Sequence, residues 1–419
     1  MRRKMPAIIE PLPSEVITVV PSGAAMVPRR RSGHAVDRVA QLTGLLTGLV
    51  SQGMTIDQLV WRKSLEARAP ASIKALANDL SCYAAFHHRA GGIGLPLCEA
   101  KLVAYLDDCE ERNLSPATVG RRIASLAVVH GLLGVSSPTL APVVRDAMRG
   151  FRKRHGRRQR QAGPLRYGEG IGIEAAKGFT LFALLEACPG TVVGLRDAAL
   201  LSLGYDAGLR VSELVAIDLV DISRLDDGAG VLDVVRSKTD QEGRGGEAWL
   251  SPDTMRRIDT WREAAMIASG PLFRRIVVNR RKVGAVRRAD SARQWSTAPA
   301  IGDLHVGSSE TRPMSVHCLI GEEALTPAAV RLIIKRTALR AAECGLVSLI
   351  GKDLDRGIAA LSTHSLRVGL TQDLFANGED AGPIAQALRW TSTATALRYG
   401  RKLAPVSNAT ARMLRHIRG

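Results

Sequence analysis

Six residues in the C-terminal half of the chain combine guanidinium, ammonium, imidazole, indole and phenol groups. In chain order they are Arg210, Lys238, His364, Arg367, Trp390 and Tyr399. Two guanidinium groups suit the charge that develops on the non-bridging oxygens when a phosphodiester is attacked. A tyrosine oxygen can form a covalent ester that keeps the bond energy, and a lysine can protonate a departing sugar oxygen. No carboxylate pair has metal-site spacing, so we expect chemistry without a metal or other cofactor.

Each of the short motifs also has an ordinary structural explanation. The stretch from Gly208 to Leu214 fits a turn with a surface ion pair, and Lys238 fits an exposed loop. His364 and Arg367 lie three residues apart, which puts both side chains on one face of a helix. Tyr399 lies between two arginines, whose mutual repulsion a nearby anion such as phosphate would offset.

The composition favours a folded chain of two domains that binds a polyanion. Of its 419 residues, 46% are hydrophobic and 23% are charged, which excludes disorder for most of the length. Single cores stop growing at about 250–300 residues, so one domain is not expected. The net charge of +18 points to nucleic acid. Because aromatic residues make up only 4%, duplex DNA is a better candidate than stacked single strands.

Targeting signals and paired cysteines are both lacking in the sequence pattern. No stretch reaches the ~18 apolar residues that a membrane span needs, and prolines and glutamates interrupt the N-terminal apolar segments. The six cysteines are scattered and form no C-x-x-C pair, which is typical of a reduced compartment without disulfides or structural zinc. We therefore expect a cytoplasmic protein.

Charge and periodicity divide the chain into four parts. Residues 1–34 are expected to be a flexible basic arm, residues 35–155 a helical domain and residues 156–175 a basic linker. Residues 176–419 are expected to mix helices and strands, with a loop insertion at 279–313 and a C-terminal helix at 406–419. The basic run that leads into the linker fits either a solvated face or a segment lying along phosphate. It contains Arg152, Lys153, Arg154, Arg157 and Arg158.

Apolar spacing and capping residues predict the individual elements. The first domain should hold helices at 35–52, 71–89, 95–112, 116–133 and 141–154, with Ser115 capping the fourth and Pro116 starting it. Later helices are expected at 195–207, 252–268, 327–344, 364–376, 382–388 and 393–399. Residues 231–236 and 247–251 should pair as a β-hairpin.

Taken in order, the six residues resemble the tyrosine recombinases, the phage integrase family, and most of all its Cre recombinase branch. Cre-like members carry tryptophan at the position of Trp390, whereas many other members of the family carry histidine there. The stretches Gly208–Ile222 and Arg236–Thr239 also resemble the family. The interval between Lys238 and His364 is longer than the family's, through the 279–313 insertion. The similarity covers the C-terminal half well from about residue 180 and is fainter before it.

The resemblance implies a fold class, which is a mainly α catalytic domain with a small β-sheet (α+β). It also implies an all-α helical-bundle, SAM-like core-binding domain before it, the two forming a C-shaped clamp on duplex DNA. It implies that Tyr399 is the nucleophile, that Arg210 and Arg367 hold the phosphate and that Trp390 donates to it. Lys238 would be the general acid, His364 would assist proton transfer, and Glu213 would support the site.

The implied function is site-specific recombination or integration of a mobile genetic element in a bacterial or phage context. Duplex DNA would be cut and rejoined through a 3′-phosphotyrosyl intermediate and a Holliday junction, without metal or ATP. The implied partners are an inverted-repeat DNA site, four copies of the chain on two such sites, and an accessory directionality protein. Residues expected to contact DNA are Arg121, Arg122, Arg152, Lys153, Arg154, Arg157 and Arg158. Two alternatives are a type IB topoisomerase and a catalytically silent DNA-binding regulator.

Overall fold

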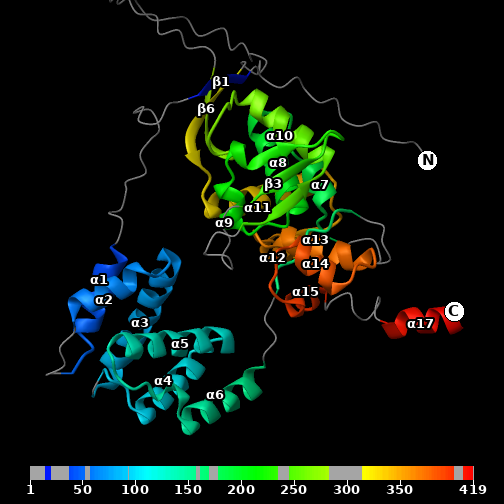
Figure 1. The fold of residues 1–419 in the computed structure, drawn as a ribbon. Coiled ribbons are helices and arrows are strands. Elements are labelled where there is room, and N and C mark those ends of the chain that lie inside the picture. Colours follow the sequence, from blue (N-terminus) through cyan, green and yellow to red (C-terminus); the bar gives the residue numbers. More distant parts are fainter. Residues whose placement is uncertain are drawn as a thin grey trace, which may run out of the picture. The chain divides into compact units, whose positions relative to one another are not determined.

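The computed structural model divides the chain into two compact units, residues 28–161 and residues 1–27 with 162–419 (Figure 1). This division falls within the predicted linker 156–175. None of the helices among the described residues is long and apolar enough to span a membrane. The structure describes residues 15–19, 37–51, 57–92, 94–156, 161–168, 178–234, 245–282, 314–400 and 409–418.

The unit of residues 28–161 consists of helices in its described part. The five predicted helices are confirmed, with ends that differ by a few residues. An additional helix, α2, was not predicted, because Leu59 and Val60 are exposed and mask the buried spacing of Trp61 and Leu65. The elements are α1 (Arg38–Thr47), α2 (Gln58–Glu66), α3 (Pro70–Ala90), α4 (Glu99–Glu111), α5 (Pro116–Leu132), η1 (Pro138–Leu140) and α6 (Pro142–His155).

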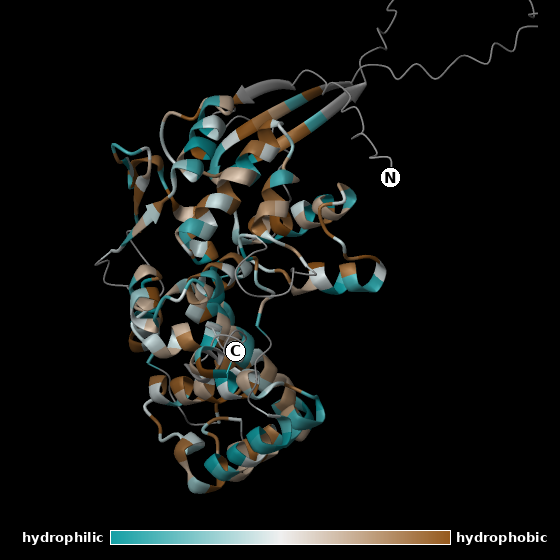
Figure 2. Ribbon diagram, turned by 90° about the vertical axis from the view of Figure 1, so that its right-hand side faces the viewer, coloured by the Kyte–Doolittle hydropathy of each residue, from teal (hydrophilic) through white to brown (hydrophobic). Residues whose placement is uncertain are grey.

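Local capping explains where α5 begins. The Ser115 hydroxyl accepts a hydrogen bond from the Thr118 N–H at 3.2 Å, and Pro116 occupies the first helical position, as predicted. The helices bury one face each around an aromatic centre, in which the rings of Tyr83 and Tyr105 meet edge to face at 5.3 Å. Polar and apolar residues therefore share the same helices, as the hydropathy colouring of Figure 2 shows.

The second unit combines further helices with two small sheets. The six predicted helices after residue 164 are confirmed, whereas α7, α9 and α12, each of ten residues or fewer, were not predicted. The helices are α7 (Leu181–Glu186), α8 (Val192–Asp206), α9 (Val211–Ala216), η2 (Leu219–Asp221), α10 (Pro252–Ala264), α11 (Pro327–Glu343), α12 (Gly351–Ala360), α13 (Ser365–Ala376), α14 (Ala381–Ala387), α15 (Thr393–Gly400) and α17 (Ala409–Arg418).

The predicted β-hairpin is part of an antiparallel sheet in the order β2 (Ile222–Arg224), β3 (Gly230–Asp233) and β4 (Glu247–Leu250). The register places Val231 opposite Trp249, which confirms the hairpin. Residues 235–244, which include Lys238, lie outside the described residues.

A second sheet corrects two expectations. Its order is β1 (Glu15–Val19), β6 (Met314–Ala324) and β5 (Arg274–Lys282), with β1 parallel and β5 antiparallel to β6. The expected flexible arm 1–34 thus contains a strand. The first four residues of the expected loop 279–313 continue β5, and 283–313 lie outside the described residues. Both were missed because backbone pairing with a distant strand needs no alternating apolar pattern.

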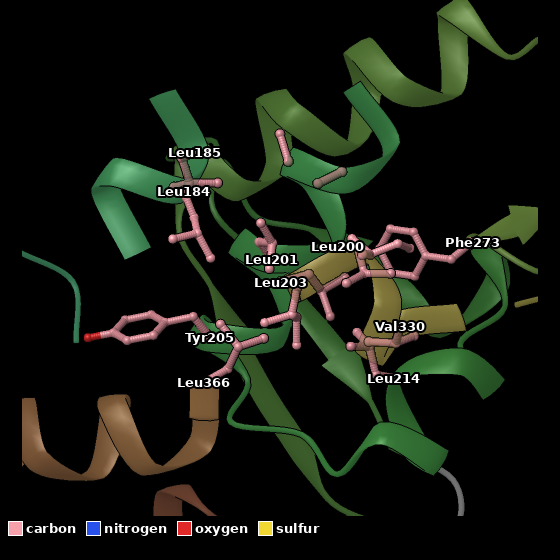
Figure 3. Packing of buried hydrophobic residues seen from close by; sticks show 14 of the residues in the cluster. Leu184, Leu185, Leu200, Leu201, Leu203, Tyr205, Leu214, Phe273, Val330 and Leu366 are labelled. Carbon is pink, nitrogen blue, oxygen red and sulfur yellow. The ribbon is translucent and has the colours of Figure 1, made fainter. Parts of the chain in front are cut away.

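Helix α8 is the centre of this unit and is buried on nearly all sides. A Cβ at Gly204 would lie 2.9 Å from Leu366 on α13 and 3.2 Å from Leu214 on α9, so both leucines pack closely against α8. Figure 3 shows these two side chains beside Leu203 in the apolar cluster. The packing places the starts of α9 and α13 next to each other, and these are the segments that carry Arg210, His364 and Arg367.

Candidate active site

Arg210 follows a tight chain reversal between α8 and α9. Gly208 has φ +54°, and a Cβ there would lie 2.2 Å from Leu388, so this position suits glycine for both conformation and space. Arg210 directly precedes α9. The Glu213 carboxylate accepts a hydrogen bond from the Arg210 backbone N–H at 2.8 Å and another from Arg210 Nη1 at 2.7 Å. The buried carboxylate thereby holds both the backbone and the side chain of Arg210.

Helix α13 supplies His364 and Arg367. The Ser362 hydroxyl accepts a hydrogen bond from the His364 N–H at 3.1 Å, just before the helix. Arg367 is 1% exposed and donates from Nη2 to the Leu388 carbonyl at 2.6 Å. Its Nη1 lies 4.0 Å from Glu213 and is buried without a hydrogen-bond partner among the described residues. A buried, unpaired guanidinium N–H is suited to bind an oxygen of an anionic ligand.

Trp390 and Tyr399 come together from the segments around α14 and α15. Their rings stack with centroids 5.2 Å apart and planes 9° from parallel, and the Arg367 guanidinium lies 4.9 Å from the centre of the Trp390 ring. The Tyr399 hydroxyl is hydrogen-bonded to Nε2 of His364. A Cβ at Gly400 would lie 2.6 Å from Phe375, so the end of α15 fits tightly against α13. The sequence positions 364, 367, 390 and 399 therefore meet in one site.

Burial sets the protonation states of the site. Burial, and then the charges of Arg367 and Arg210, lower the pKa of His364 below its ordinary value. Burial raises the pKa of Tyr399, although Arg367, Arg398 and Arg210 act in the opposite direction. Near neutral pH the site therefore pairs a neutral phenol with a neutral imidazole, which can accept its proton.

Arg367, which is buried, and Arg210, which is partly exposed, carry positive charges that the protein compensates only in part. Burial and the charge of Arg210 lower the pKa of Arg367 to about 10, while Glu213 acts to raise it. The guanidinium stays protonated at neutral pH despite this unfavourable environment. One carboxylate thus faces two cations, and an added anion would be attracted to the site.

Comparison with known proteins finds recombinases of similar sequence. No family model matches the chain. The integrase/recombinase xerD homolog of Selenomonas ruminantium is 30% identical over 225 residues, 51% of this chain and 62% of that protein. The recombinase cre of Escherichia phage P1 is 26% identical over 316 residues, 74% of this chain and 78% of that protein. Over half to three quarters of its length the chain is thus similar to these two recombinases. The match spans less than two thirds of the first relative's length.

Solved structures of tyrosine recombinases also align with most of the chain. XerH site-specific recombinase, bound to palindromic difH substrate in a post-cleavage complex, is 14% identical with a TM-score of 0.49. The alignment covers 89% of this chain and 94% of that chain.

The base of the hairpin whose loop contains Lys238 in the sequence lies beside the site. Lys238 itself is outside the described residues. The hairpin base is closed by a hydrogen bond from the Val234 N–H to the Gly246 carbonyl at 2.8 Å. A Cβ at Gly246 would lie 2.8 Å from the side chain of Arg389, which directly precedes Trp390. Sequence reasoning passed over Arg389, because nothing in the sequence distinguishes it from the chain's many other arginines.

The expected DNA contacts in the helical unit fall into distinct environments. Arg122 is a wrong prediction: it is 8% exposed and directs its guanidinium to Tyr105 and the sulfurs of Cys82 and Cys109. Its helix turns this position inward, so it cannot contact DNA in this conformation. Arg121 is half exposed and pairs with the buried Asp79 at 2.6 Å.

The basic end of α6 keeps several cations on the surface. Arg152 and Lys153 are exposed, and Arg154 forms two hydrogen bonds with Glu110 at 2.7 and 2.6 Å. Arg157 and Arg158 lie outside the described residues. Because both side chains are exposed, Arg152 and Lys153 remain candidates for DNA contact on this helix.

Proposed function

We propose that the chain is a site-specific recombinase or integrase that cuts and rejoins duplex DNA through a 3′-phosphotyrosyl intermediate. The observation that carries the proposal is the pairing of Tyr399 with His364 beside the unpaired Nη1 of Arg367. A nucleophile, a base and an anion-binding donor are thereby next to one another. This is the arrangement that phosphoryl transfer to a tyrosine requires.

The cleavage step uses the side chains in separate roles. The Tyr399 oxygen attacks the scissile phosphorus and forms a P–O bond, while its proton passes to His364. The bond from phosphorus to the 5′ oxygen breaks, and Lys238 donates a proton to that oxygen. Arg210, Arg367 and the indole N–H of Trp390 stabilise the negative charge on the non-bridging oxygens. Glu213 holds Arg210 in position.

Rejoining reverses these steps with a 5′-hydroxyl from another strand. That hydroxyl attacks the phosphotyrosyl ester and gives its proton back to Lys238, while the bond to Tyr399 breaks and His364 returns the other proton to the phenolate. The ester conserves the energy of the original phosphodiester, so the proposed exchange through a Holliday junction consumes no ATP. The side-chain donors named above carry the charge stabilisation in this scheme, without a metal.

DNA binding is assigned to both units. We assign the helical unit and the basic linker, with Arg152 and Lys153, to contacts along the phosphate backbone. Neutralising about ten phosphates would lower the affinity about 10³–10⁵-fold between 50 and 200 mM salt. An inverted-repeat target would give each half-site one copy of the chain.

Helix α17 is assigned to assembly of four copies on two DNA sites. It carries exposed apolar side chains, with Met413 at 54% and Ile417 at 66% exposure, alternating with arginines. An apolar stripe of this kind is suited to bury itself in a neighbouring copy. An accessory protein would then set the direction of exchange.

Covalent trapping tests the proposed function directly. The wild type and Tyr399→Phe are incubated with duplexes from the gene's own flanks. A nick in these duplexes lets the short cleaved fragment diffuse away, so that the strand cannot be rejoined. We expect an SDS-resistant protein–DNA adduct with the wild type only, and equal DNA binding by both. Salt-sensitive binding without any adduct would favour a DNA-binding regulator. An adduct in the Phe variant would show that Tyr399 is not the nucleophile.

A plasmid assay separates recombination from topoisomerase action. A supercoiled plasmid that lacks the trapped site should stay supercoiled, because a recombinase cleaves only after assembling on its site. Relaxation of that plasmid at a rate equal to a site-bearing plasmid would favour the type IB topoisomerase alternative.

A further inference from the structure

The turn between α14 and Trp390 has an unusual backbone. Arg389 has φ +54°, in the left-handed region that glycine adopts readily and arginine rarely does. Since the preceding Leu388 packs against Gly208 and its carbonyl accepts from Arg367, the turn is closely fitted to the site on both sides. An arginine at such a position indicates that its side chain has a role there.

The Arg389 side chain joins three segments that surround the site. Its Nη2 donates to the Ala207 carbonyl at 2.8 Å, at the reversal that leads to Arg210. Its Nη1 lies 3.5 Å from the Glu247 carbonyl in β4 and 3.4 Å from the Ala387 carbonyl at the end of α14. The guanidinium therefore lies between the segments that carry Arg210 and Trp390 and the base of the β3–β4 hairpin.

We propose that Arg389 is a positioning residue, which holds the Arg210 segment and the Trp390 turn in register so that both donors face one phosphate. This inference rests on the proposed function. Arg389 is half-buried and its donors face backbone carbonyls, so it acts through its neighbours rather than by contact with the substrate. A guanidinium fork can reach two carbonyls at once, which a lysine ammonium on its single atom does less well.

Electrostatics agrees with the geometry. Burial lowers the pKa of Arg389, with Arg210 acting in the same direction and Glu213 opposing it. A third guanidinium thus shares the single carboxylate of Glu213 with Arg210 and Arg367. Its charge adds to the positive potential at the phosphate site, while its hydrogen bonds fix the distance between the two segments.

The test uses Arg389→Gly in the full-length chain. Glycine accepts the turn's backbone conformation freely, so the variant removes the guanidinium without adding backbone strain. Met266→Gly is the matched control, because Met266 also has a positive φ, +51°, and is exposed just after α10. Single-turnover cleavage is measured on the trapping duplex and on the same duplex with a methylphosphonate at the scissile position. The methyl group removes the charge that Arg210 and Trp390 would stabilise.

We expect Arg389→Gly to bind DNA normally and to cleave the phosphate about 10–100-fold more slowly, since small misplacements of catalytic groups have effects of this size. On the methylphosphonate its rate should come within about threefold of the wild type. Met266→Gly should match the wild type on both substrates. Equal slowing of Arg389→Gly on both substrates, or no slowing, would overturn the inference.

A double-variant comparison provides a second measurement that does not need the methylphosphonate. If Arg389 acts through Arg210, adding Arg389→Gly to Arg210→Lys should slow cleavage little further, whereas independent effects would multiply. Multiplying effects would overturn the inference. Failure of the wild type to form any adduct would instead refute the proposed function.

Discussion

Replacing Glu213 by glutamine tests the electrostatic reasoning about the site. The carboxylate is 3% exposed and is the single acidic partner of Arg210 and Arg367 among the described ion pairs. Glutamine keeps the size and one acceptor oxygen but removes the charge. The free protein should lose stability, because two neighbouring cations then lack compensation.

The size of the effect follows from burial. Removing one partner of a buried ion pair costs about 3–5 kcal/mol. The Arg210 side chain is 22% exposed and keeps part of its hydration. We therefore expect the lower end, about 3 kcal/mol, which corresponds to a fall in Tm of about 6–12 °C for a unit of this size.

Thermal unfolding with and without duplex DNA measures the loss of stability. Single-turnover cleavage measures the effect on catalysis. DNA should narrow the difference in Tm, because a bound phosphate supplies the missing negative charge. Cleavage by the folded variant should be about 10–100-fold slower, because Arg210 loses its orienting acceptor. Asp253→Asn is the control: its pairs with Arg256 and Arg257 are partly exposed and should contribute less than about 1 kcal/mol.

Two results would refute the reasoning. An unchanged Tm would mean that Glu213 does not compensate the arginines. If the Tm falls but the folded variant cleaves at the wild-type rate, Glu213 has a structural role only.

Four further predictions concern the site and the DNA contacts. Because burial lowers the pKa of His364 below that of an ordinary imidazole, cleavage should stay level from pH 7 down through the ordinary imidazole range and fall only at lower pH, and His364→Asn should remove this acid limb from a pH–rate profile. Trp390→Phe keeps a ring beside Tyr399 but loses the N–H, so trapping rates should fall about 100-fold with unchanged binding. Arg152→Ala should reduce the slope of log affinity against log salt by about one, whereas Arg122→Met should leave salt titrations unchanged. Truncation at Ala404 should abolish assembly on DNA in sedimentation experiments while the monomer keeps its Tm.

Several features of the site could be predicted from the sequence because they are local or chemical. The capped start of α5, the β3–β4 hairpin and the helix at His364 follow from short-range capping and periodicity. The residue types themselves identified the candidate set, since few functions require two arginines, a histidine and a tyrosine together. Five of its six members come together in the structure, and Lys238 stays a prediction.

Environment could not be predicted in the same way. Arg121 and Arg122 are neighbours on α5, yet one is half exposed beside Asp79 and the other is buried against Tyr105. A one-residue step rotates a helix position by about 100°, so small differences in how a helix faces its core decide between surface and interior. No property of the two arginines themselves separates them.

The sequence by itself determined the chemistry available to this protein, the order of its helices and the strongly basic character that suits DNA. Only the tertiary structure decided which groups meet: the Tyr399–His364 hydrogen bond, the shared Glu213 carboxylate, the strand β1 beside β6 and the Arg389 turn. Each of these joins segments far apart in the chain. Local propensity governs neighbouring residues, whereas such contacts form only when the packing around α8 brings separate elements to one place.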